Sequence, residues 1–324
     1  MAWRLRLAPE KTSIDFFRWQ GVTFGGSMIL MVLAFVAWGV MGLNFGIDFL
    51  GGTTIRTESS TPVDVAAYRA ALDALDLGDV SITQVFDPTF GPEQNVAMIR
   101  IQAQAGQESV TPEMVLAVQD ALRTVYPAMS FPSVESVGPK VSGELIQTAI
   151  IAVIASLGAI LVYIWLRFEW QFSVGAVAAL IHDIILTVGI FALLQIRFDL
   201  ATIAALLTIV GYSINDTVVI FDRLRENLVK YKSRGLQDVM NLSANETLSR
   251  TLMTSGTTLL ALLALLVLGG DVIRGFVFAI FWGVIVGTYS SIFVAKNIVL
   301  MIGVKRDWSK PDAKAGTQFS NIDA

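Results

Sequence analysis

Six runs of apolar residues divide the chain, and each is long enough to cross a lipid bilayer as a helix. One crossing needs about 20 apolar residues. The pattern therefore predicts six membrane-spanning helices, at residues 21–43, 146–166, 172–194, 200–221, 251–268 and 276–302. The first run is too long for a signal-peptide core and no convincing small-residue cleavage site accompanies it, so we expect it to be a retained anchor.

The segment 44–143 between the first two runs has a different pattern, because no stretch in it is apolar enough to span. Short β-prone stretches alternate with stretches in which apolar residues have helical spacing. Two Thr-Pro pairs suit helix starts, with threonine as the N-cap and proline at the first helical position. The predicted order is strand 53–59, a helix from Thr61-Pro62, strands 80–86 and 95–103, a helix from Thr111-Pro112, and strand 131–137.

This β-α-β-β-α-β order is typical of the ferredoxin-like split unit. The expected fold is therefore an α-helical polytopic membrane protein with six transmembrane helices. A ferredoxin-like α+β domain is inserted between helices one and two.

Composition supports the membrane class and excludes several others. The chain has 324 residues, of which 54% are hydrophobic and only 15% charged, whereas about 25% of an average soluble domain is charged. The absence of cysteine excludes disulfides, Cys-ligated zinc and a thiol nucleophile, and a single histidine excludes a His-rich metal site. Without a basic domain or a nucleophile–base set, we expect no nucleic-acid binding, no enzyme activity, no metal and no cofactor.

The distribution of charge predicts the orientation in the membrane. Lysine and arginine gather in residues 1–20, in the polar stretch 222–250 and from residue 296 onwards, and an even number of spans puts all three on one side. By the positive-inside rule that side is cytoplasmic. Segment 44–143, with twelve acidic and five basic residues, then lies outside.

The predicted organisation has five parts. They are a cytoplasmic N-terminal segment at 1–20, transmembrane helix one at 21–43, an external domain at 44–143, helices two to six at 144–303 with a cytoplasmic loop at 222–250, and a cytoplasmic polar tail at 304–324.

Asp216 is the strongest candidate for chemistry, because a carboxylate inside a membrane span is costly and indicates function by default. Ser213 and Tyr212 precede it by three and four residues on the same helix face, and Asn215 adjoins it. Burial disfavours the charged carboxylate and a nearby cation favours it, so a group held between the two can load and release a proton. The alternative is that Asp216 simply reaches the headgroups, although residues 218–221 separate it from the charged patch.

Arg250, at the cytoplasmic end of the fifth predicted helix, is the candidate cation. A polar stripe of Thr254 and Thr258, with Thr251 and Ser255 beside it, continues from Arg250 along that helix. Such hydroxyl groups suit a water-lined path. The alternative is that Arg250 is an ordinary positive flank of a membrane helix.

His182 and Asp183 lie near the middle of the third predicted helix, with apolar residues on both sides. Two interpretations stay open for this pair. It holds helices together through hydrogen bonds, or it takes part in proton passage.

Gly46, Asp48, Gly51 and Gly52 mark the exit of the first helix. Adjacent glycines allow a turn that side chains would block, so we interpret this segment as a structural junction that orients the external domain. Phosphate binding is not expected, because no Walker or Rossmann spacing completes the motif.

These motifs resemble the bacterial SecF family over nearly the whole chain, from the first helix to about residue 303. The matching segments are 46–53 (Gly-Ile-Asp-Phe-Leu-Gly-Gly-Thr), 137–145 (Val-Gly-Pro-Lys-Val-Ser-Gly-Glu-Leu), His182-Asp183, 211–227 (Gly-Tyr-Ser-Ile-Asn-Asp-Thr-Val-Val-Ile-Phe-Asp-Arg-Leu-Arg-Glu-Asn) and 250–258 (Arg-Thr-Leu-Met-Thr-Ser-Gly-Thr-Thr). Segment 211–227 is highly specific, whereas the glycine junction alone would be weak.

The resemblance implies an accessory subunit of the Sec preprotein translocase, within the resistance-nodulation-division superfamily. Members of that superfamily commonly have twelve membrane helices in two halves, so SecD would supply the other half. The external domain would lie in the periplasm, and both termini would lie on the cytoplasmic side of the bacterial inner membrane. The pair would use the proton motive force to promote late steps of export, with Asp216 as the essential carboxylate and Arg250 as its cationic partner.

The resemblance also implies further partners, namely the SecYEG channel, SecA and the unfolded preprotein, with YajC and YidC as additional candidates. Two other functions stay open from the residues alone. One is a half-size proton-coupled exporter of small or lipidic molecules, and the other is an assembly partner whose polar groups only hold helices together. A carboxylate among hydroxyls suits protons or sodium ions equally.

Overall fold

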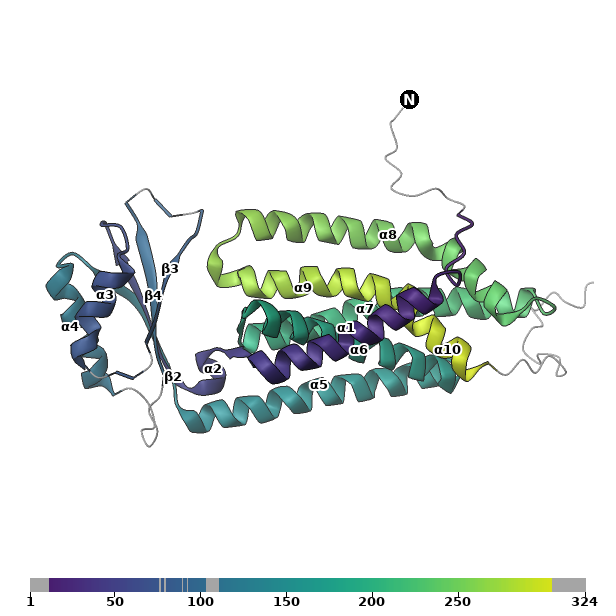
Figure 1. The fold of residues 1–324 in the computed structure, drawn as a ribbon, viewed down its shortest axis with the longest axis horizontal. Coiled ribbons are helices and arrows are strands. Elements are labelled where there is room, and N and C mark those ends of the chain that lie inside the picture. The colour runs from purple at the N-terminus through teal and green to yellow at the C-terminus, as the bar shows by residue number, and fades with distance from the viewer. Residues whose placement is uncertain are drawn as a thin grey trace, which may run out of the picture.

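The computed structural model describes residues 12–75, 77–78, 80–88, 90–91, 93–102 and 111–304. Long helices form a bundle, and a small α+β unit lies at one end of it (Figure 1). Among the described residues, six helices are long and apolar enough to cross a membrane. The predicted polytopic helical membrane protein is therefore confirmed. Of the predicted terminal segments, 1–11 and 305–324 lie outside the described residues.

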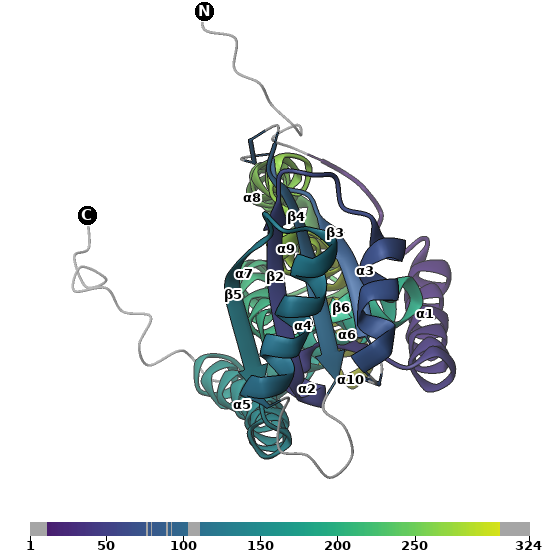
Figure 2. The ribbon, with the colours of Figure 1, turned by 90° about the vertical axis from the view of Figure 1, so that its left-hand side faces the viewer.

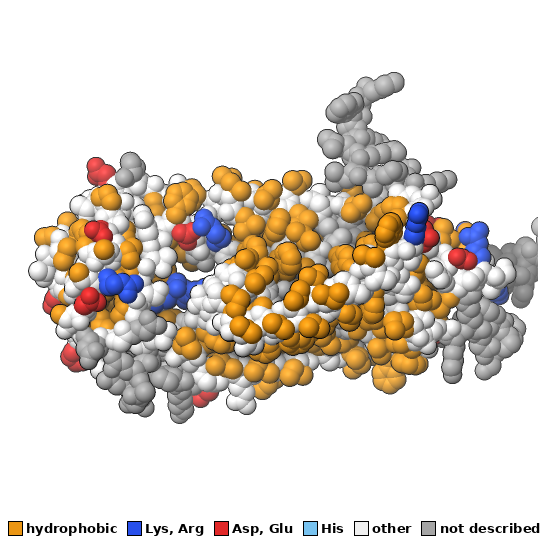
Figure 3. Space-filling view, in the orientation of Figure 1, with side chains coloured by type: hydrophobic (Ala, Val, Ile, Leu, Met, Phe, Trp, Pro, Cys, Tyr) orange, Lys and Arg blue, Asp and Glu red, His pale blue; other side chains and the backbone are white. Residues whose placement is uncertain are grey.

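The six membrane helices form two layers. The inner helices, α6, α7 and α9, carry many buried residues, whereas α1, α5 and α8 lie on the outside. Apolar side chains cover the outer surface of the bundle, and charged side chains gather toward its two ends (Figure 3). The bounds are α1 Gln20–Met41, α5 Pro139–Arg167, α6 Trp170–Leu194, α7 Leu200–Lys230, α8 Leu236–Leu268 and α9 Asp271–Ser290, continued by π-helical Ser291–Ala295 and α10 Lys296–Ile302.

The prediction of a loop at 222–250 was wrong, because α7 and α8 extend through most of this stretch and only residues 231–235 connect them. The two extensions form a helical hairpin. Asn227 Nδ2 donates to Ser243 Oγ at 3.0 Å and to Glu246 Oε2 at 2.6 Å. Apolar side chains of both helices also join the buried core. The polar composition of the stretch reflects the solvated face of an amphipathic hairpin rather than a loop.

The α+β unit is a four-stranded antiparallel sheet with the strand order β3-β4-β2-β5. Helices α3 and α4 cover one face, and the other face is turned toward the bundle (Figures 1 and 2). Ile55, Ile99 and Leu122 are fully buried between sheet and helices. The elements are β2 Gly52–Ser59, α3 Val65–Leu72, the 3₁₀ turn Asp73–Leu75, β3 Val80–Val85, β4 Asn95–Gln102, α4 Pro112–Val125 and β5 Ser130–Val137.

Only one of the two predicted helix starts is correct. Thr111 caps α4 by accepting from the backbone N–H of Met114, and Pro112 takes the first helical position. At α3 the N-cap is Asp64, whose side chain accepts from two backbone N–H groups, so the helix begins three residues later than predicted. The hydroxyl of Thr61 instead lies 2.8 Å from that of Ser59 at the end of β2.

Three contacts that the sequence did not predict attach the α+β unit to the bundle. Strand β1 (Asn44–Phe45) pairs in parallel with β6 (Arg197–Phe198), the connection between α6 and α7. The short helix α2 (Ile47–Leu50) follows β1, and the ring of its Phe49 packs against Phe198 with 5.9 Å between centroids. On the opposite side of the unit, Phe86 and Asp271 exchange two hydrogen bonds, one from each backbone N–H.

The N-terminal stretch that precedes α1 lies against α8. The side chain of Asn245 accepts from Ile14 N–H and donates to Ile14 C=O, both at 2.8 Å, and Asn241 accepts from Phe16 N–H. The rings of Phe16 and Phe17 then cover Lys296, whose Nζ lies 4.1 Å from the Phe17 ring centroid. Lys296 is 1% exposed, so this cation contacts aromatic rings and not water.

Close packing of α1 on α6 depends on Gly189. A Cβ atom at this position would lie 2.3 Å from Ala34 Cβ and 2.8 Å from Ala34 Cα. Because Ala34 has no flexible side chain that could move away, Gly189→Ala should destabilise the protein by about 1–3 kcal/mol. Heat unfolding of the purified protein measures this change. Gly25→Ala in α1 is the control, since nothing lies within 4 Å of its Cβ, and equal melting temperatures for both variants would contradict the prediction.

Candidate functional site

Asp216 lies at the centre of α7, and its side chain is only 3% exposed. Ser255 Oγ of α8 donates to Asp216 Oδ2 at 3.5 Å, and the same hydroxyl lies 2.7 Å from Thr288 Oγ1 of α9. The carboxylate is therefore held among three helices inside the bundle. This position argues against the alternative that Asp216 merely reaches the headgroups.

Arg250 lies near Asp216 without a direct ion pair. Helices α7 and α8 pack side by side, which the sequence could not establish, and Arg250 precedes Ser255, which contacts the carboxylate, by five residues on α8. Within the described residues no salt bridge joins the two side chains. Arg250 is exposed in this chain, so its guanidinium is available to another partner. The structure brings the two predicted residues into one region but does not pair them.

The predicted hydroxyl stripe of α8 is only partly directed at the carboxylate. Ser255 is the member that reaches Asp216. Thr254 donates back to its own helix, to the carbonyls of Arg250 and Thr251, and Thr258 accepts from Tyr212 Oη at 3.3 Å. Thr254 therefore satisfies helix carbonyls and makes no hydrogen bond to the carboxylate.

Asp183 forms a second polar centre, between α6, α7 and α9. Its Oδ2 accepts from Ser213 Oγ at 2.6 Å and from Ser290 Oγ at 2.8 Å, and its Oδ1 lies 3.0 Å from His182 Nδ1. Asp183 is 1% exposed. One buried carboxylate thus links side chains from three inner helices.

Ser213 was expected beside Asp216, and the structure corrects this expectation. Three residues on an α-helix are separated by about 60° around the axis. Ser213 therefore faces Asp183 on α6, whereas Asp216 faces Ser255 on α8. Asn215 lies on the exposed side of α7 and makes no hydrogen bond among the described residues.

The contribution of α9 was not predicted from the sequence. Ser290 donates to Asp183, Thr288 meets Ser255, and the ring of Tyr289 stacks on His182 with 6.5 Å between centroids. The sequence did contain a signal, since residues 288–291 are four consecutive hydroxyl side chains within an apolar run. Close packing supports the arrangement, because a Cβ at Gly287 would lie 2.9 Å from Ser213 Cβ.

The glycine junction connects α1 to the sheet by a sharp change of direction. Gly51 and Gly52 have φ angles of 74° and 133°, which side chains rarely allow. A Cβ at Gly46 would lie 3.0 Å from Arg197 Nε. Asp48 Oδ2 accepts from Leu200 N–H at the start of α7. These contacts support the interpretation of this segment as a structural junction.

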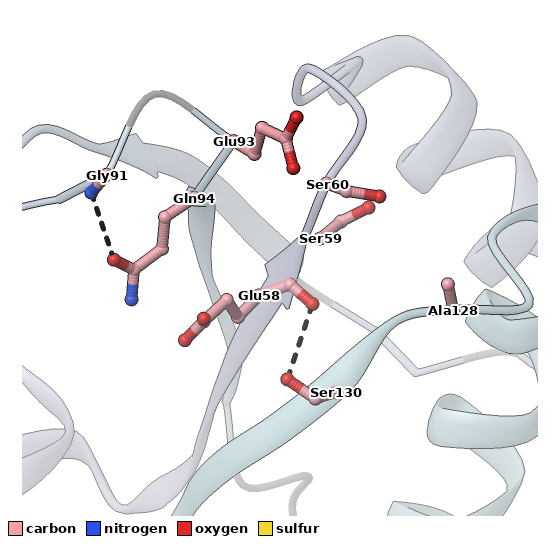
Figure 4. A pocket seen from close by; sticks show the side chains of 8 residues that line it. All are labelled: Glu58, Ser59, Ser60, Gly91, Glu93, Gln94, Ala128 and Ser130. Carbon is pink, nitrogen blue, oxygen red and sulfur yellow. Dashed lines mark hydrogen bonds between the residues drawn. The ribbon is translucent and has the colours of Figure 1, made fainter.

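The described part of the chain offers no metal site beside these two carboxylates. It contains no group of three or more His, Cys, Asp and Glu side chains that could hold a metal ion. An open depression lies where β2 ends, and Figure 4 shows its lining. Glu58, Glu93 and Gln94 line it together with small residues, and it lies in the α+β unit, apart from both buried carboxylates.

Comparisons with known proteins identify the family. The model for the C-terminal part of SecD/SecF protein export membrane proteins matches residues 117–305, and the SecD/SecF GG motif matches residues 36–63. The protein translocase subunit SecF of Cereibacter sphaeroides is 68% identical over 324 residues, which is the full length of both chains. The chain belongs to the SecF family. The SecF of Rhodobacter capsulatus is 62% identical and covers 96% of each chain.

A solved structure extends the likeness to three dimensions. The crystal structure of SecDF from Thermus thermophilus, described as a translocon-associated membrane protein, has a TM-score of 0.80 and 36% sequence identity. The match covers 91% of this chain and 39% of the SecDF chain, so this chain spans about two fifths of that protein. A second SecDF structure, in a super-membrane-facing form, has a TM-score of 0.67.

Family membership confirms the resemblance drawn from the motifs. A SecF protein is an accessory, non-enzymatic subunit of the protein translocase, so the prediction that the chain is not an enzyme is also confirmed. The matched GG motif includes Gly51 and Gly52 of the junction. The half-size exporter is no longer needed to explain the chain.

Proposed function

We propose that this SecF chain pairs with a SecD chain and uses ion movement through the membrane to promote late steps of preprotein export. One observation carries the proposal. Asp216 is a carboxylate buried within a membrane bundle, in contact with a hydroxyl group of a neighbouring helix, and no described residue forms an ion pair with it. Intramembrane carboxylates of this kind typically mark ion pathways.

The local geometry suits reversible loading of an ion. The carboxylate is buried and accepts a hydrogen bond from Ser255, and a cation stands on the same neighbouring helix, an arrangement in which opposing influences act on a proton. Movement of one charge across the membrane releases about 2.3 kcal/mol per 100 mV. A few charges are therefore enough to shift the populations of a two-state domain.

The proposal includes a partner that completes the membrane unit. The chain corresponds to 39% of a SecDF chain, so SecD would supply the complementary helices. Asn215 and Arg250 are exposed here, and contact with SecD would bury them. SecYEG, SecA and the unfolded preprotein are proposed as further partners, with YajC and YidC as additional candidates.

The proposed location is the bacterial inner membrane, with both termini cytoplasmic. The α+β unit would be a ferredoxin-like domain in the periplasm, as its strand order and its acidic composition suggest. Basic residues in the hairpin between α7 and α8 support a cytoplasmic location for the other end of the bundle.

Ion transport by the purified complex tests the coupling. We expect proteoliposomes that contain SecD and this chain to move protons inward when a membrane potential is imposed, as a pH-sensitive dye would report. Arg250→Gln should reduce this flux at least about tenfold, because the charge that favours release of the proton is lost. Arg234→Gln, at the tip of the cytoplasmic hairpin, is the control and should leave the flux unchanged.

The same vesicles distinguish the two ions. If the flux depends on the sodium gradient and not on the pH gradient, the coupling ion is sodium and not the proton. No flux of either ion from a well-assembled complex would contradict ion coupling through this site.

A further inference from the structure

Three arginines surround Met98 between the α+β unit and the bundle. Arg56 of β2 lies directly opposite Met98 of β4, so the two side chains share a face of the sheet. Arg100, two residues farther along β4, has the same orientation, and its Nη2 lies 3.2 Å from Met98 Sδ. Arg197 of β6 approaches from the bundle and places Nη1 4.0 Å from the same sulfur.

This arginine cluster lies on the sheet face that α3 and α4 leave uncovered. Ile55 and Ile99 alternate with Arg56 and Arg100 along their strands and are buried beneath the two helices. The arginines therefore point toward the bundle. Figure 3 shows a notch between the two parts of the molecule, with Lys and Arg side chains beside it.

The cluster has more donors than acceptors. In each of the three arginines Nε is buried and has no hydrogen-bond partner in the described part of the chain. The sulfur of Met98 is only a weak acceptor, and leaving a buried charged donor without an acceptor is costly. These guanidinium groups therefore need an acceptor that the described residues do not supply.

The nearest carboxylate does not balance the cluster. Asp199 Oδ2 lies 3.9 Å from Arg197 Nε, but Asp199 also caps α7 by accepting from the backbone N–H and the hydroxyl of Thr202. Arg56 lies over the ring of Phe90. Burial and the neighbouring charge of Arg197 lower the pKa of Arg100 to about 10, against the opposing effect of Asp199. Positive charge is in excess here.

We propose that the arginine cluster binds a side-chain carboxylate of an extended polypeptide that passes between the α+β unit and the bundle. The proposal rests on the proposed role in preprotein export, which brings unfolded polypeptide to this end of the molecule. Guanidinium groups bind carboxylates through paired, charge-assisted hydrogen bonds. The cluster thus serves acidic segments of the substrate and holds them against the sheet.

A lipid headgroup suits the position less well. Arg197 lies between the ends of α6 and α7, which are inner helices of the bundle. Its side chain is turned toward Met98 of the sheet, and Figure 2 shows β6 near the centre of the view, with α1, α5 and α8 at the periphery. Thr83, on the neighbouring strand β3, pairs directly with Met98 and is exposed. A polypeptide can therefore reach the arginine cluster along this face of the sheet.

Photo-crosslinking from Thr83 tests the proposal. The full chain, with benzoylphenylalanine at position 83, is assembled with SecD in nanodiscs of phosphatidylcholine, and a fluorescent extended peptide with four glutamates is added. We expect it to be captured about tenfold more than the same peptide with four glutamines, as one charge-assisted pair would provide. Arg100→Gln combined with Arg197→Gln should abolish this preference.

Matched variants separate recognition from folding. Arg69→Gln removes an exposed arginine of α3 on the opposite side of the sheet and should keep the preference. Arg100→Glu, which would form an internal pair with Arg197 and so keep the contact between the two parts stable, should abolish it. Equal capture of both peptides by the unaltered protein overturns the proposal. The proposal is also overturned if capture is lost when phosphatidylglycerol replaces phosphatidylcholine, or when millimolar inorganic phosphate is added. Either result would show that the arginine cluster binds phosphate groups.

The outcome is independent of ion coupling, since peptide capture needs no gradient. If Asp216→Asn stops export and the protein shows no preference for the glutamate peptide, only the proposal that the arginine cluster binds carboxylates is wrong. If export survives Asp216→Asn and the preference is present, only the ion coupling is wrong.

Discussion

Asp216→Asn should reduce preprotein export at least about tenfold while leaving the complex with SecD intact. Loss of the movement of one charge through 100 mV removes about 2.3 kcal/mol, or about fiftyfold in an equilibrium. Asparagine keeps the shape of the side chain and can accept the hydrogen bond of Ser255 but cannot release a proton. Export is measured in cells depleted of the native protein, with variant and unaltered chain at matched levels.

Two observations in the same cells make the result decisive. Co-purification with SecD shows whether the variant still assembles. Asp222→Asn neutralises a half-exposed carboxylate farther along the same helix, which pairs with Arg167. This variant should keep nearly full export because surface ion pairs contribute little. Normal export by Asp216→Asn would show that this carboxylate is not the coupling site. It would favour the interpretation in which the polar groups only hold helices together. Loss of both export and assembly would show damaged packing instead.

Asp183→Ala should destabilise the bundle by about 2 kcal/mol, from three hydrogen bonds of about 0.6 kcal/mol each in a membrane. It would leave the hydroxyls of Ser213 and Ser290 without their buried acceptor. Asp183→Asn should lose less than half as much, because its amide oxygen can accept from both. Heat unfolding of the purified complex with SecD gives the stability of each variant.

A measurement of export then distinguishes the two interpretations of the His182–Asp183 pair, namely helix stabilisation and proton passage. A carboxylate bonded to three inner helices is expected to hold them together, so export per assembled complex should stay near normal in Asp183→Asn. Thr187→Val is the control on the same helix, since that hydroxyl only donates to the backbone carbonyl of Asp183. A stable Asp183→Asn complex that exports nothing would contradict this view and place Asp183 in the ion path.

The sequence was most informative where the decisive forces are local. Hydrophobic run length located all six membrane helices, because each span satisfies its own backbone hydrogen bonds and needs only about 20 apolar residues. Alternation and helical spacing located the four strands and two helices of the α+β unit within a few residues. Asp216 stood out for the same reason, since its cost depends on the apolar residues next to it in the chain.

Local pattern failed where a segment serves a distant neighbour. The stretch 222–250 was interpreted as a loop from its polarity, yet Asn227 and Ser243 join two helices across it. Thr61-Pro62 has the residue types of a helix start, but Thr61 lies against Ser59 at the end of β2, and Asp64 caps the helix instead. In both cases the observed structure depends on which surfaces become buried, and local composition does not determine which surfaces those are.

By itself the sequence determined the class of protein, its spans and the family that its motifs resemble, and it singled out Asp216 as the carboxylate to test. Only the tertiary structure decided how the polar groups are shared. It directed Ser213 to Asp183 and Ser255 to Asp216, buried Lys296 beneath two rings, and brought Arg197 to Arg100 from residues far apart in the chain. The physical reason is that a helix fixes the direction of each side chain, whereas its partner depends on which helix or strand packs against that side.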